Sequence, residues 1–467
     1  LEKFFEKGNL TEEEMRNGIH RAIQDQIFVP LFCTSSTTNI GVARVCDFIS
    51  KYGSSPDDRK TVTAHDEQGN DVDVSLDGND TVLQIFKTMS ESHVGEFSFF
   101  RVYSGKVKTG KDYYNTNRNI NERFGQMFLL NGKNRTQVDQ LFAGDIGGVV
   151  KLKDTHTGNT LSSGKHLKLP ELSLPNPNIH AAIRPTAKGD EEKLAIGLAT
   201  LHEEDSTFVY RVDSEVNQTI ISGQGELHLT VSTERLKRRF GIDIQLEEPK
   251  IPFRETITKK AASKYRHKKQ SGGAGQFAEV WMRIEPRPKG EGIDFTHSLV
   301  GQNVDRVFVP SVEKGVKTAC AEGILAGSNV VDIKVDFYDG KMHPVDSKDI
   351  AFQTAGKHAF REAFLSAQPC LLEPIMDIEV KIPEEYMGDI MGDISGKRGK
   401  IMGMEADGTF QIIKAQVPQA ELYHYATTVR SLTGGRGIHS ESLSHYEKMP
   451  KDYEQKVIQK RQKVEDE

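Results

Sequence analysis

The sequence has few of the features that mark secreted, membrane-spanning or zinc-binding proteins. Its 467 residues include only four cysteines, which are scattered and form no Cys-x-x-Cys pair. That pattern argues against a disulfide framework or a zinc site and is typical of a reducing compartment. No stretch approaches the about 20 apolar residues of a membrane span, and no signal peptide precedes the first folded segment. We therefore expect a cytoplasmic protein with no membrane partner.

An excess of positive charge is also missing. Lys and Arg number 61 against 67 Asp and Glu, a formal net charge of −6, so contacts with nucleic acid must come from local basic patches. The sequence contains no Gly-x-x-x-x-Gly-Lys-Ser/Thr phosphate loop and no Asn-Lys-x-Asp element for a guanine base. We expect no catalytic residue, no bound metal or cofactor, and no GTP hydrolysis by these residues alone.

The N-terminal segment has the pattern of the last piece of an α/β sheet. Thr11 and Glu14 have the spacing of a capping box before an amphipathic run, which predicts a helix. The apolar run Ile27–Phe32 then predicts a strand, and Val42–Ile49 predicts a second helix. Because a single strand of a parallel sheet needs neighbours, we expect this chain to be a fragment of a longer protein.

Four further segments follow a linker rich in Gly, Ser, Pro and Asp. Between about residues 60 and 170, short β runs such as Arg123–Leu130 alternate with turn signals, which predicts a small antiparallel barrel. Residues 178–248 and 374–446 each have the order βαββαβ, the split-βαβ arrangement. The segment between them predicts an α+β domain, with a strand at Val330–Tyr338.

The most distinctive segment is a basic hairpin in this middle domain. From Lys264 to Trp281 a run of cations breaks into a glycine-rich loop and then into an alternating strand. Such a cluster attracts phosphate even on an acidic protein, and glycines let the backbone approach a partner closely. Taken alone, the hairpin is equally compatible with a solvated loop. A later turn with His343, Asp346 and Ser347 exposes three hydrogen-bonding groups.

Two basic loops in the last βαββαβ segment are further candidates for RNA contact. One contains Lys397 and Arg398 and follows the first helix, whereas the other contains Arg436 and follows the second helix. Both loops can lie at the same end of such a fold, where arginines and lysines would contact an RNA backbone. Solvated turn charges are the competing interpretation.

Together these motifs resemble elongation factor G. The resemblance covers almost the whole chain, in the order and at the spacing of that family. It rests on these runs: Gly223–Leu229, Glu234–Gly241, Pro252–Ile257, the hairpin Lys264–Trp281, Lys397–Glu405 and Ser444–Glu447.

The resemblance implies a fold and a domain order. It predicts a multidomain α+β protein in which an antiparallel β-barrel, a ferredoxin-like domain, an α+β domain with an S5-like fold and a second ferredoxin-like domain follow a remnant of an α/β GTPase domain. The implied segments are the GTPase remnant (1–55), domain II (56–172), domain III (173–249), domain IV (250–372), domain V (373–450) and a charged tail (451–467).

The resemblance also implies a function and site residues. The parent protein would be a GTPase that uses GTP and Mg²⁺ and moves tRNA and mRNA through the ribosome, and we expect a monomer that contacts ribosomal RNA as well. Ser35 and Ser36 match the residues that contact the guanine. The implied RNA contacts are His267, Lys268, Lys269, Gln270, Ser271, Gly272, Gly273, Gly275, Gln276, His343, Asp346 and Ser347, to which the two basic loops add Lys397, Arg398 and Arg436.

Two departures from the family pattern keep other functions open. Ala274 stands where elongation factor G usually has an arginine, and Pro344 stands where it usually has an acidic residue. The first removes a cation from the loop, and the second fixes one φ angle of the turn. The chain could thus derive from a diverged paralogue specialised for ribosome recycling or ribosome protection. A freestanding RNA-binding module is the alternative from another class.

Overall fold

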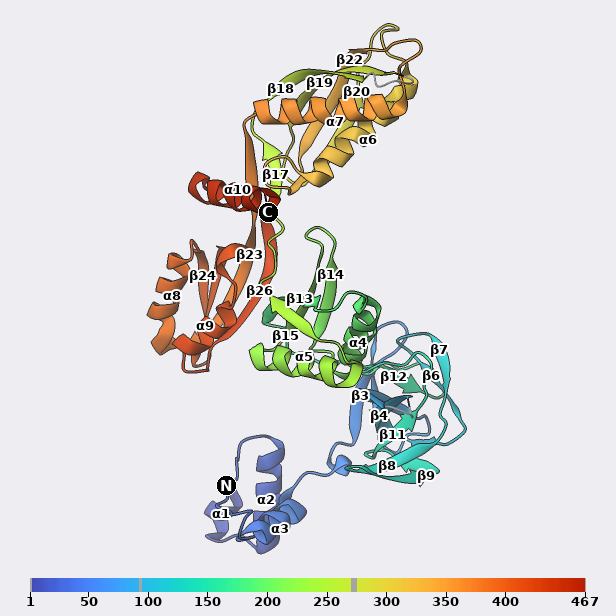
Figure 1. Cartoon of the computed structure of the whole chain (residues 1–467). Helices are drawn as coiled ribbons and strands as arrows, with labels where there is room; N and C mark the ends of the chain where they lie inside the picture. The colour runs from blue at the N-terminus through green and yellow to red at the C-terminus, as the bar shows by residue number, and fades with distance from the viewer. Residues whose placement is uncertain (1, 92–94, 270–274, 467) are drawn as a thin grey trace. The chain divides into compact units, whose positions relative to one another are not determined.

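The computed structural model describes residues 2–91, 95–269 and 275–466. The chain divides into two compact units, one formed by Leu1–Leu174 with Ala199–Ser206 and the other by Pro175–Leu198 with Thr207–Glu467. Figure 1 draws the succession of helices and strands along the chain. Separate sheets with their own helices confirm the predicted multidomain α+β class. Among the described residues, none of the helices combines the length and apolarity needed to span a membrane.

Three helices form the N-terminal segment: α1 (Glu2–Lys7), α2 (Glu12–Gln24) and α3 (Val42–Tyr52). The predicted capping box at the start of α2 is confirmed. The side chain of Thr11 accepts the N–H of Glu14 at 3.2 Å, and the carboxylate of Glu14 accepts the N–H of Thr11 at 3.1 Å. These reciprocal bonds satisfy two N–H groups at the helix start.

The strand predicted at Ile27–Phe32 is wrong, because these residues form no strand in the described structure. A strand needs a neighbouring strand for its N–H and C=O groups. The nearest pairing is an isolated bridge between Ser35 and Ile40. The apolar side chains of the run remain exposed, Val29 by 84% and Leu31 by 93%. An apolar run with β propensity thus stays unpaired when no described strand lies beside it.

Domain II is built from antiparallel strands, as its turn-separated β runs predict. Eight of them form one sheet in the order β7-β6-β12-β3-β4-β11-β8-β9. The strands of the domain are β1 (Thr61–His65), β2 (Asp71–Ser75), β3 (Val82–Glu91), β4 (Gly95–Ser104), β5 (Lys106–Lys108), β6 (Asp112–Asn115), β7 (Ile120–Arg123), β8 (Met127–Asn131), β9 (Asn134–Val138), β10 (Gln140–Phe142), β11 (Ile146–Val150) and β12 (Thr160–Ser162).

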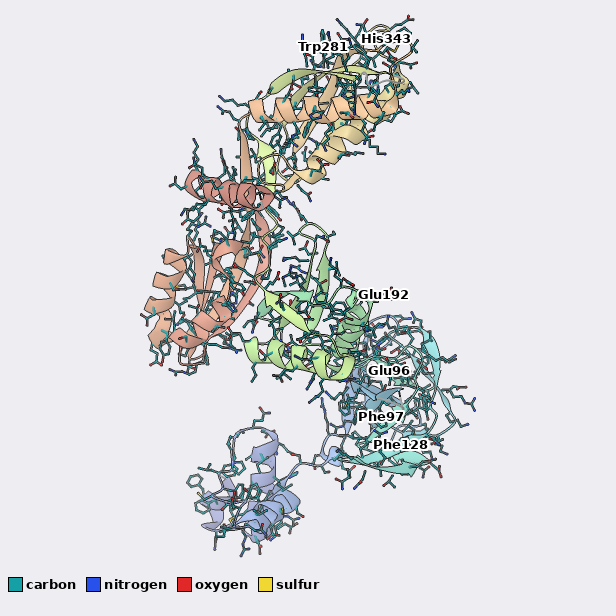
Figure 2. All side chains as sticks on the ribbon, in the orientation of Figure 1. Glu96, Phe97, Phe128, Glu192, Trp281 and His343 are labelled. Carbon is teal, nitrogen blue, oxygen red and sulfur yellow. The ribbon has the colours of Figure 1, made fainter. Side chains whose placement is uncertain are left out.

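Aromatic side chains fill much of the core of domain II. The ring of Phe124 is fully buried and lies 5.4 Å from that of Phe100, centroid to centroid. Phe97 and Phe128, labelled in Figure 2, approach to 6.2 Å. Phe124 also separates β7 from β8, so the single strand predicted at Arg123–Leu130 is two strands.

Domains III and V have the same topology, as their shared βαββαβ order predicts. Numbered along each domain, the sheet order is 2-3-1-4, which is β14-β15-β13-β16 in one and β24-β25-β23-β26 in the other. Domain III contains β13 (Ile179–Pro185), α4 (Glu191–Glu204), β14 (Val209–Asp213), β15 (Gln218–Gly223), α5 (Glu226–Phe240) and β16 (Ile244–Glu247). Domain V contains β23 (Pro369–Pro383), α8 (Met387–Gly396), β24 (Lys400–Asp407), β25 (Phe410–Pro418), α9 (Tyr425–Leu432) and β26 (Ile438–Lys448).

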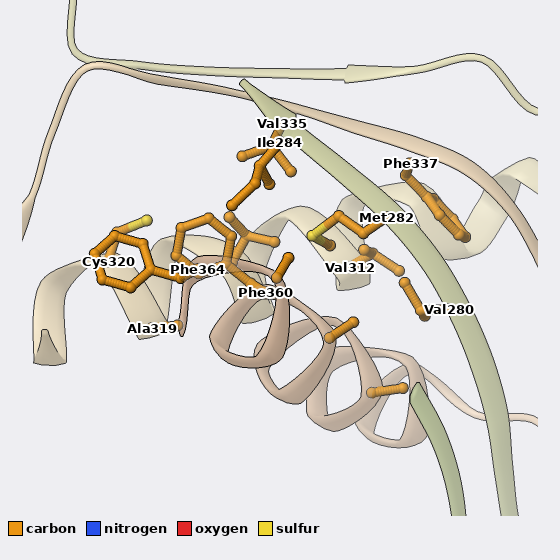
Figure 3. Close-up of a cluster of buried hydrophobic side chains, with 14 of the residues drawn as sticks. Val280, Met282, Ile284, Val312, Ala319, Cys320, Val335, Phe337, Phe360 and Phe364 are labelled. Carbon is orange, nitrogen blue, oxygen red and sulfur yellow. The ribbon is translucent and has the colours of Figure 1, made fainter. Parts of the chain in front are cut away.

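Domain IV packs two helices on one face of a four-stranded sheet with the order β18-β19-β22-β20. Alternate residues of β19, including Val280 and Met282, face the helices and meet Phe360 and Phe364 in a dry core (Figure 3). The elements are β17 (Arg254–Ile257), β18 (Ala261–Lys269), β19 (Gln276–Pro286), β20 (Ile293–His297), α6 (Val309–Glu322), β21 (Asn329–Val330), β22 (Ile333–Lys341) and α7 (Asp349–Ser366).

The strand predicted at Val330–Tyr338 is divided into β21 and β22. Asp332 lies between them with a φ of 58°, a left-handed conformation that interrupts a strand. Its carboxylate accepts the N–H of Gly292 at 2.9 Å, which holds the turn in place. The division lets β21 pair with β17 and β22 pair with β19.

Domains IV and V share one strand. β23 pairs through its first residues with β17 of domain IV and through later residues with β25 of domain V. The C-terminal helix α10 (Lys451–Asp466) lies against the same junction, where Val457 and Ile458 pack on a small core with Leu371 and Met449. The charged tail therefore forms a packed helix, because its few apolar residues fall on one face.

A buried carboxylate closes this junction. Glu255 on β17 is fully buried and accepts four backbone N–H groups, those of Ile324, Leu325, Ala326 and Ser328, at 2.7 to 3.0 Å. An ionised carboxylate can accept all four bonds, whereas an amide oxygen cannot. The loop between α6 and β21 thus depends on one side chain.

We expect the substitution Glu255→Gln to destabilise domain IV by about 2–4 kcal/mol, because it leaves buried N–H groups without acceptors. Trp281, the single tryptophan, lies in this domain, so the shift of the urea midpoint can be followed by its fluorescence. The control Glu362→Gln removes an exposed carboxylate of α7. Equal midpoints for the two variants would contradict the role given to Glu255.

A candidate RNA interface

The predicted hairpin exists, and the structure shows which way its side chains face. β18 and β19 pair in antiparallel register from Ala261–Ile284 to Lys269–Gln276. Lys268 and Lys269 are exposed at its end, on opposite faces because successive residues of a strand alternate. His267 points to the helix-covered face, where its Nε2 lies 3.0 Å from Oε1 of Gln276. That pair crosses the two strands and holds the end of the hairpin.

The turn at the end of β22 lies against this hairpin. Ser347 joins the two, because its Oγ donates to the carbonyl of Phe277 and accepts the N–H of His343, both at 2.8 Å. The N–H of Phe277 in return donates to the carbonyl of Asp346 at 2.9 Å. Two segments about 70 residues apart thus form one tip, which the resemblance to the family implied.

Backbone bonds fix the ring of His343. Its Nδ1 accepts the N–H groups of Val345 and Asp346 at 3.3 and 3.2 Å. With Nδ1 accepting, the neutral ring carries its proton on Nε2. That N–H is a hydrogen-bond donor on a half-exposed side chain at the tip, suited to a phosphate or ribose oxygen.

A glycine lies where the hairpin meets the turn. A Cβ on Gly275 would lie 2.8 to 3.0 Å from the three carboxylate atoms of Asp346. The close approach therefore sets the position of Asp346 beside His343, whose Nδ1 lies 3.5 Å from Oδ2 of Asp346. The predicted contacts Gln270, Ser271, Gly272 and Gly273 lie outside the described residues, as does the departure at Ala274.

A third segment of the tip was not among the predicted site residues. Residues 298–305, between β20 and α6, reach the turn through Asn303, whose carbonyl accepts the N–H of Met342 at 3.2 Å. The side chain of Asn303 donates to Asp339 at 3.3 Å, and Val300 is 85% exposed. In the sequence, the run Gly301-Gln302-Asn303 is a turn signal in this segment. It does not indicate at which end of domain IV the turn lies, so the segment could not be assigned to the tip.

The basic loops of domain V differ from this tip. The guanidinium of Arg398 binds Glu373 through both Nη atoms at 2.8 and 3.0 Å and Glu421 through Nε at 3.0 Å. It also lies 4.1 Å from the ring centroid of Tyr453 on α10. Burial lowers the pKa of Arg398, but the two carboxylates outweigh it and raise the pKa overall. Such a paired arginine holds domain V to α10.

The other two predicted RNA contacts of domain V, Arg436 and Lys397, have partial partners. Arg436 pairs with Glu385 and donates to the hydroxyl of Tyr386 at 2.6 Å, while its side chain stays 53% exposed. Nζ of Lys397 lies 5.6 Å from the ring centroid of Tyr425. The RNA contacts predicted for Lys397 and Arg436 remain predictions, and the geometry of Arg398 favours a structural role.

The two serines of the predicted guanine contact lie in a tight loop after α2. The N–H of Ser35 donates to the carbonyl of Ile40 at 3.0 Å, and its Oγ accepts the N–H of Thr38 at 3.4 Å. Ser36 follows in the same turn. Ser35 thus has its polar groups engaged within the loop, and the chain's sequence supplies no phosphate loop to complete a nucleotide site.

We expect Ser347→Ala to loosen the tip without unfolding the domain. It removes one bond to each segment, a cost of about 1–3 kcal/mol. Hydrogen exchange at the amides of Phe277 and His343 should accelerate by about tenfold or more. The control Ser366→Ala removes a hydroxyl bonded only within α7. Unchanged exchange at both tip amides would reject the link.

We expect Arg398→Ala to release α10 and to leave RNA contact intact. Loss of the guanidinium leaves Glu373, a side chain only 5% exposed, without its partner. Amide exchange in α10 should therefore accelerate by about tenfold or more, whereas Arg436→Ala, an exposed pair, should leave it unchanged. A variant that keeps α10 protected but loses ribosome association would restore the RNA-binding interpretation of Arg398.

Comparison with known proteins agrees with this architecture. Family models match in sequence order: elongation factor G domain 2 over residues 81–164, domain III over 174–248, domain IV over 249–368 and the elongation factor G C-terminus over 370–457. A crystal structure of a protein from Thermus thermophilus superimposes with a TM-score of 0.74 at 32% sequence identity, covering 99% of this chain and 67% of that one. The chain belongs to the elongation factor G family of translation factors.

Proposed function

We propose that this chain supplies domains II to V of a translational GTPase that promotes movement of tRNA and mRNA through the ribosome. The observation that carries the proposal is the bonded tip of domain IV, where Ser347 joins two polar segments. Domain IV is continuous with domain V through β23. A displacement of domain V would therefore move the tip, with little of the motion absorbed by bending between the domains. The coarser role, that of an elongation-factor-like protein in translation, follows from the family.

In this proposal the tip residues position RNA and perform no covalent chemistry. Lys268 and Lys269 offer charge to phosphates, and Nε2–H of His343 offers one directed donor. The short polar turn is stiffened by Pro344 and by its bonds to the hairpin. A stiff tip can displace an RNA element, because less of the applied work is lost in bending the loop.

In this proposal, GTP and Mg²⁺ bind to a longer protein of the family that contains this chain, and not to this chain alone. The chain supplies Ser35 and Ser36 for the guanine, but its sequence has no phosphate loop. These residues do not by themselves fit a nucleotide.

A second candidate function is ribosome recycling or ribosome protection. It is supported by Pro344, an exposed residue at the tip where the family pattern has an acidic side chain. A longer protein that contains this chain can be tested in vitro for peptide elongation and for splitting of ribosomal subunits. Elongation supports translocation, whereas splitting without elongation supports recycling and overturns the first proposal.

We expect Lys268→Glu with Lys269→Glu to weaken association of this chain with ribosomes by about tenfold at low salt. The reason is that phosphate contacts release counterions, so the salt dependence should also flatten. Co-sedimentation across a salt series measures both quantities. The control Lys259→Glu with Lys289→Glu makes the same charge change at the opposite end of the same strands. Equal losses in both double variants would reject a specific tip contact.

A further inference from the structure

The face of the domain IV sheet turned away from α6 and α7 carries a regular row of cations. Ser263 and Tyr265 of β18 face the helices, since Ser263 donates to Ala359 on α7 at 2.6 Å and Tyr265 stacks on His358 at 4.8 Å. The alternate residues Lys264, Arg266 and Lys268 therefore share the outer face and are exposed. Two residues along a strand span about 7 Å, so the Cα atoms of the three cations are evenly spaced.

A buried carboxylate on the neighbouring strand orients the middle cation. Glu279 of β19 has a side chain only 8% exposed, and it accepts Nε of Arg266 at 2.6 Å and Nε1 of Trp281 at 2.8 Å. Burial acts to raise the pKa of Glu279, but these hydrogen bonds and the nearby charges of Arg266 and Lys341 lower it overall. Glu279 therefore stays ionised and fixes Arg266 at neutral pH.

The bond geometry leaves the outer end of Arg266 open. Glu279 engages its Nε, and the side chain is 59% exposed. Within the part of the chain that the structure describes, no partner holds the two Nη groups, so they form a fork for a phosphate. Lys264 is held as well, because its Nζ lies 3.8 Å from the ring centroid of Trp281. Two of the three cations are thus oriented before any ligand arrives, which reduces the entropy cost of binding.

Two other cations at this sheet are already neutralised. Arg283 binds Asp336 through Nε at 2.8 Å and through Nη2 at 2.6 Å. Lys260 pairs with Glu285 at 2.7 Å. The exposed cations of this outer face therefore lie along β18, the edge strand that leads to the tip, and at Lys341 of β22, which pairs in register with Glu279.

We propose that Lys264, Arg266 and Lys268 bind the phosphate backbone of an RNA strand that runs along β18 from the tip of domain IV. The inference rests on the proposed function, which places RNA at that tip. It adds a second contact region on the side of domain IV. There the cations would bind the RNA backbone and would not distinguish one base sequence from another.

An RNA backbone fits the row better than an acidic protein segment does. An acidic peptide that added a strand to the edge of β18 would bind in the plane of the sheet. The three cations instead project from the face of the sheet, where a phosphate strand can pass over them. The even spacing suits a polymer with a charge at every repeat.

The test uses the full chain and the fluorescence of Trp281, its only tryptophan. A 12-nucleotide oligouridylate is the probe, and binding should change the emission because phosphate draws Lys264 from the indole. We expect Lys264→Gln with Arg266→Gln to weaken binding about tenfold. Each phosphate contact to a single strand contributes about 0.7 to the slope of log K, the association constant, against log salt. Loss of two contacts should therefore reduce the magnitude of the slope by about 1.4.

A matched control removes the same charge from the same sheet. Lys260→Gln with Arg283→Gln changes one lysine and one arginine that already have carboxylate partners. We expect affinity for the oligouridylate within about twofold of the unmodified chain. Because Lys264→Gln alters the fluorophore's surroundings, affinities of all variants are also measured with a fluorophore on the RNA.

Three outcomes overturn the proposal. Equal losses in the two double variants would mean that total charge, rather than the row, governs binding. Tighter binding of an oligoglutamate than of the oligouridylate, with loss in the row variant, would assign the row to an acidic protein. An unchanged row variant, when Lys268→Glu with Lys269→Glu still weakens ribosome association, would reject the row and leave the proposed function standing.

Discussion

The carboxylate of Glu255 is the interaction on which the geometry of domains IV and V depends. It is fully buried on β17, the strand through which domain IV pairs with β23, and it accepts four N–H groups from the loop after α6. β23 then continues into the sheet of domain V. The cost of burying this charge is offset only while all four donors are in place, so the junction has one well-defined arrangement.

A defined junction matters to the proposed function because the candidate RNA-binding groups lie at the far end of domain IV. A hinge between the domains would turn displacement of domain V into bending, and a shared strand resists that. Arg398 strengthens the same junction from domain V, where it binds Glu373 on β23 and contacts Tyr453 on α10. In the proposed function, the continuity of β23 and the bonds of Ser347 at the tip would both resist bending under load.

Local patterns in the sequence predicted most of the fold. For example, α5 (Glu226–Phe240) is the second helix that the βαββαβ order of residues 178–248 predicts, and it ends at Gly241, which adopts a left-handed conformation. The remaining elements depend on contacts with segments that are distant in the sequence. The run Ile27–Phe32 lacks a neighbouring strand, and the tail that became α10 needed the apolar surface at Leu371. Likewise, the meeting of His343 with the hairpin came from the family resemblance, since no local signal links segments so far apart.

The basic residues illustrate why a candidate site cannot be derived from charge alone. Arg398 and Arg266 stand in similar basic runs, yet both Nη atoms and Nε of Arg398 bind carboxylates, whereas Arg266 commits only Nε. A guanidinium with a free fork can bind phosphate with its remaining donors, but one with all edges occupied would first have to break internal pairs. In a chain with a net charge of −6, the arrangement of carboxylates therefore determines which cations are available to RNA. Glu279 shows that a carboxylate can orient a cation, here Arg266, while it engages only one of the guanidinium nitrogens.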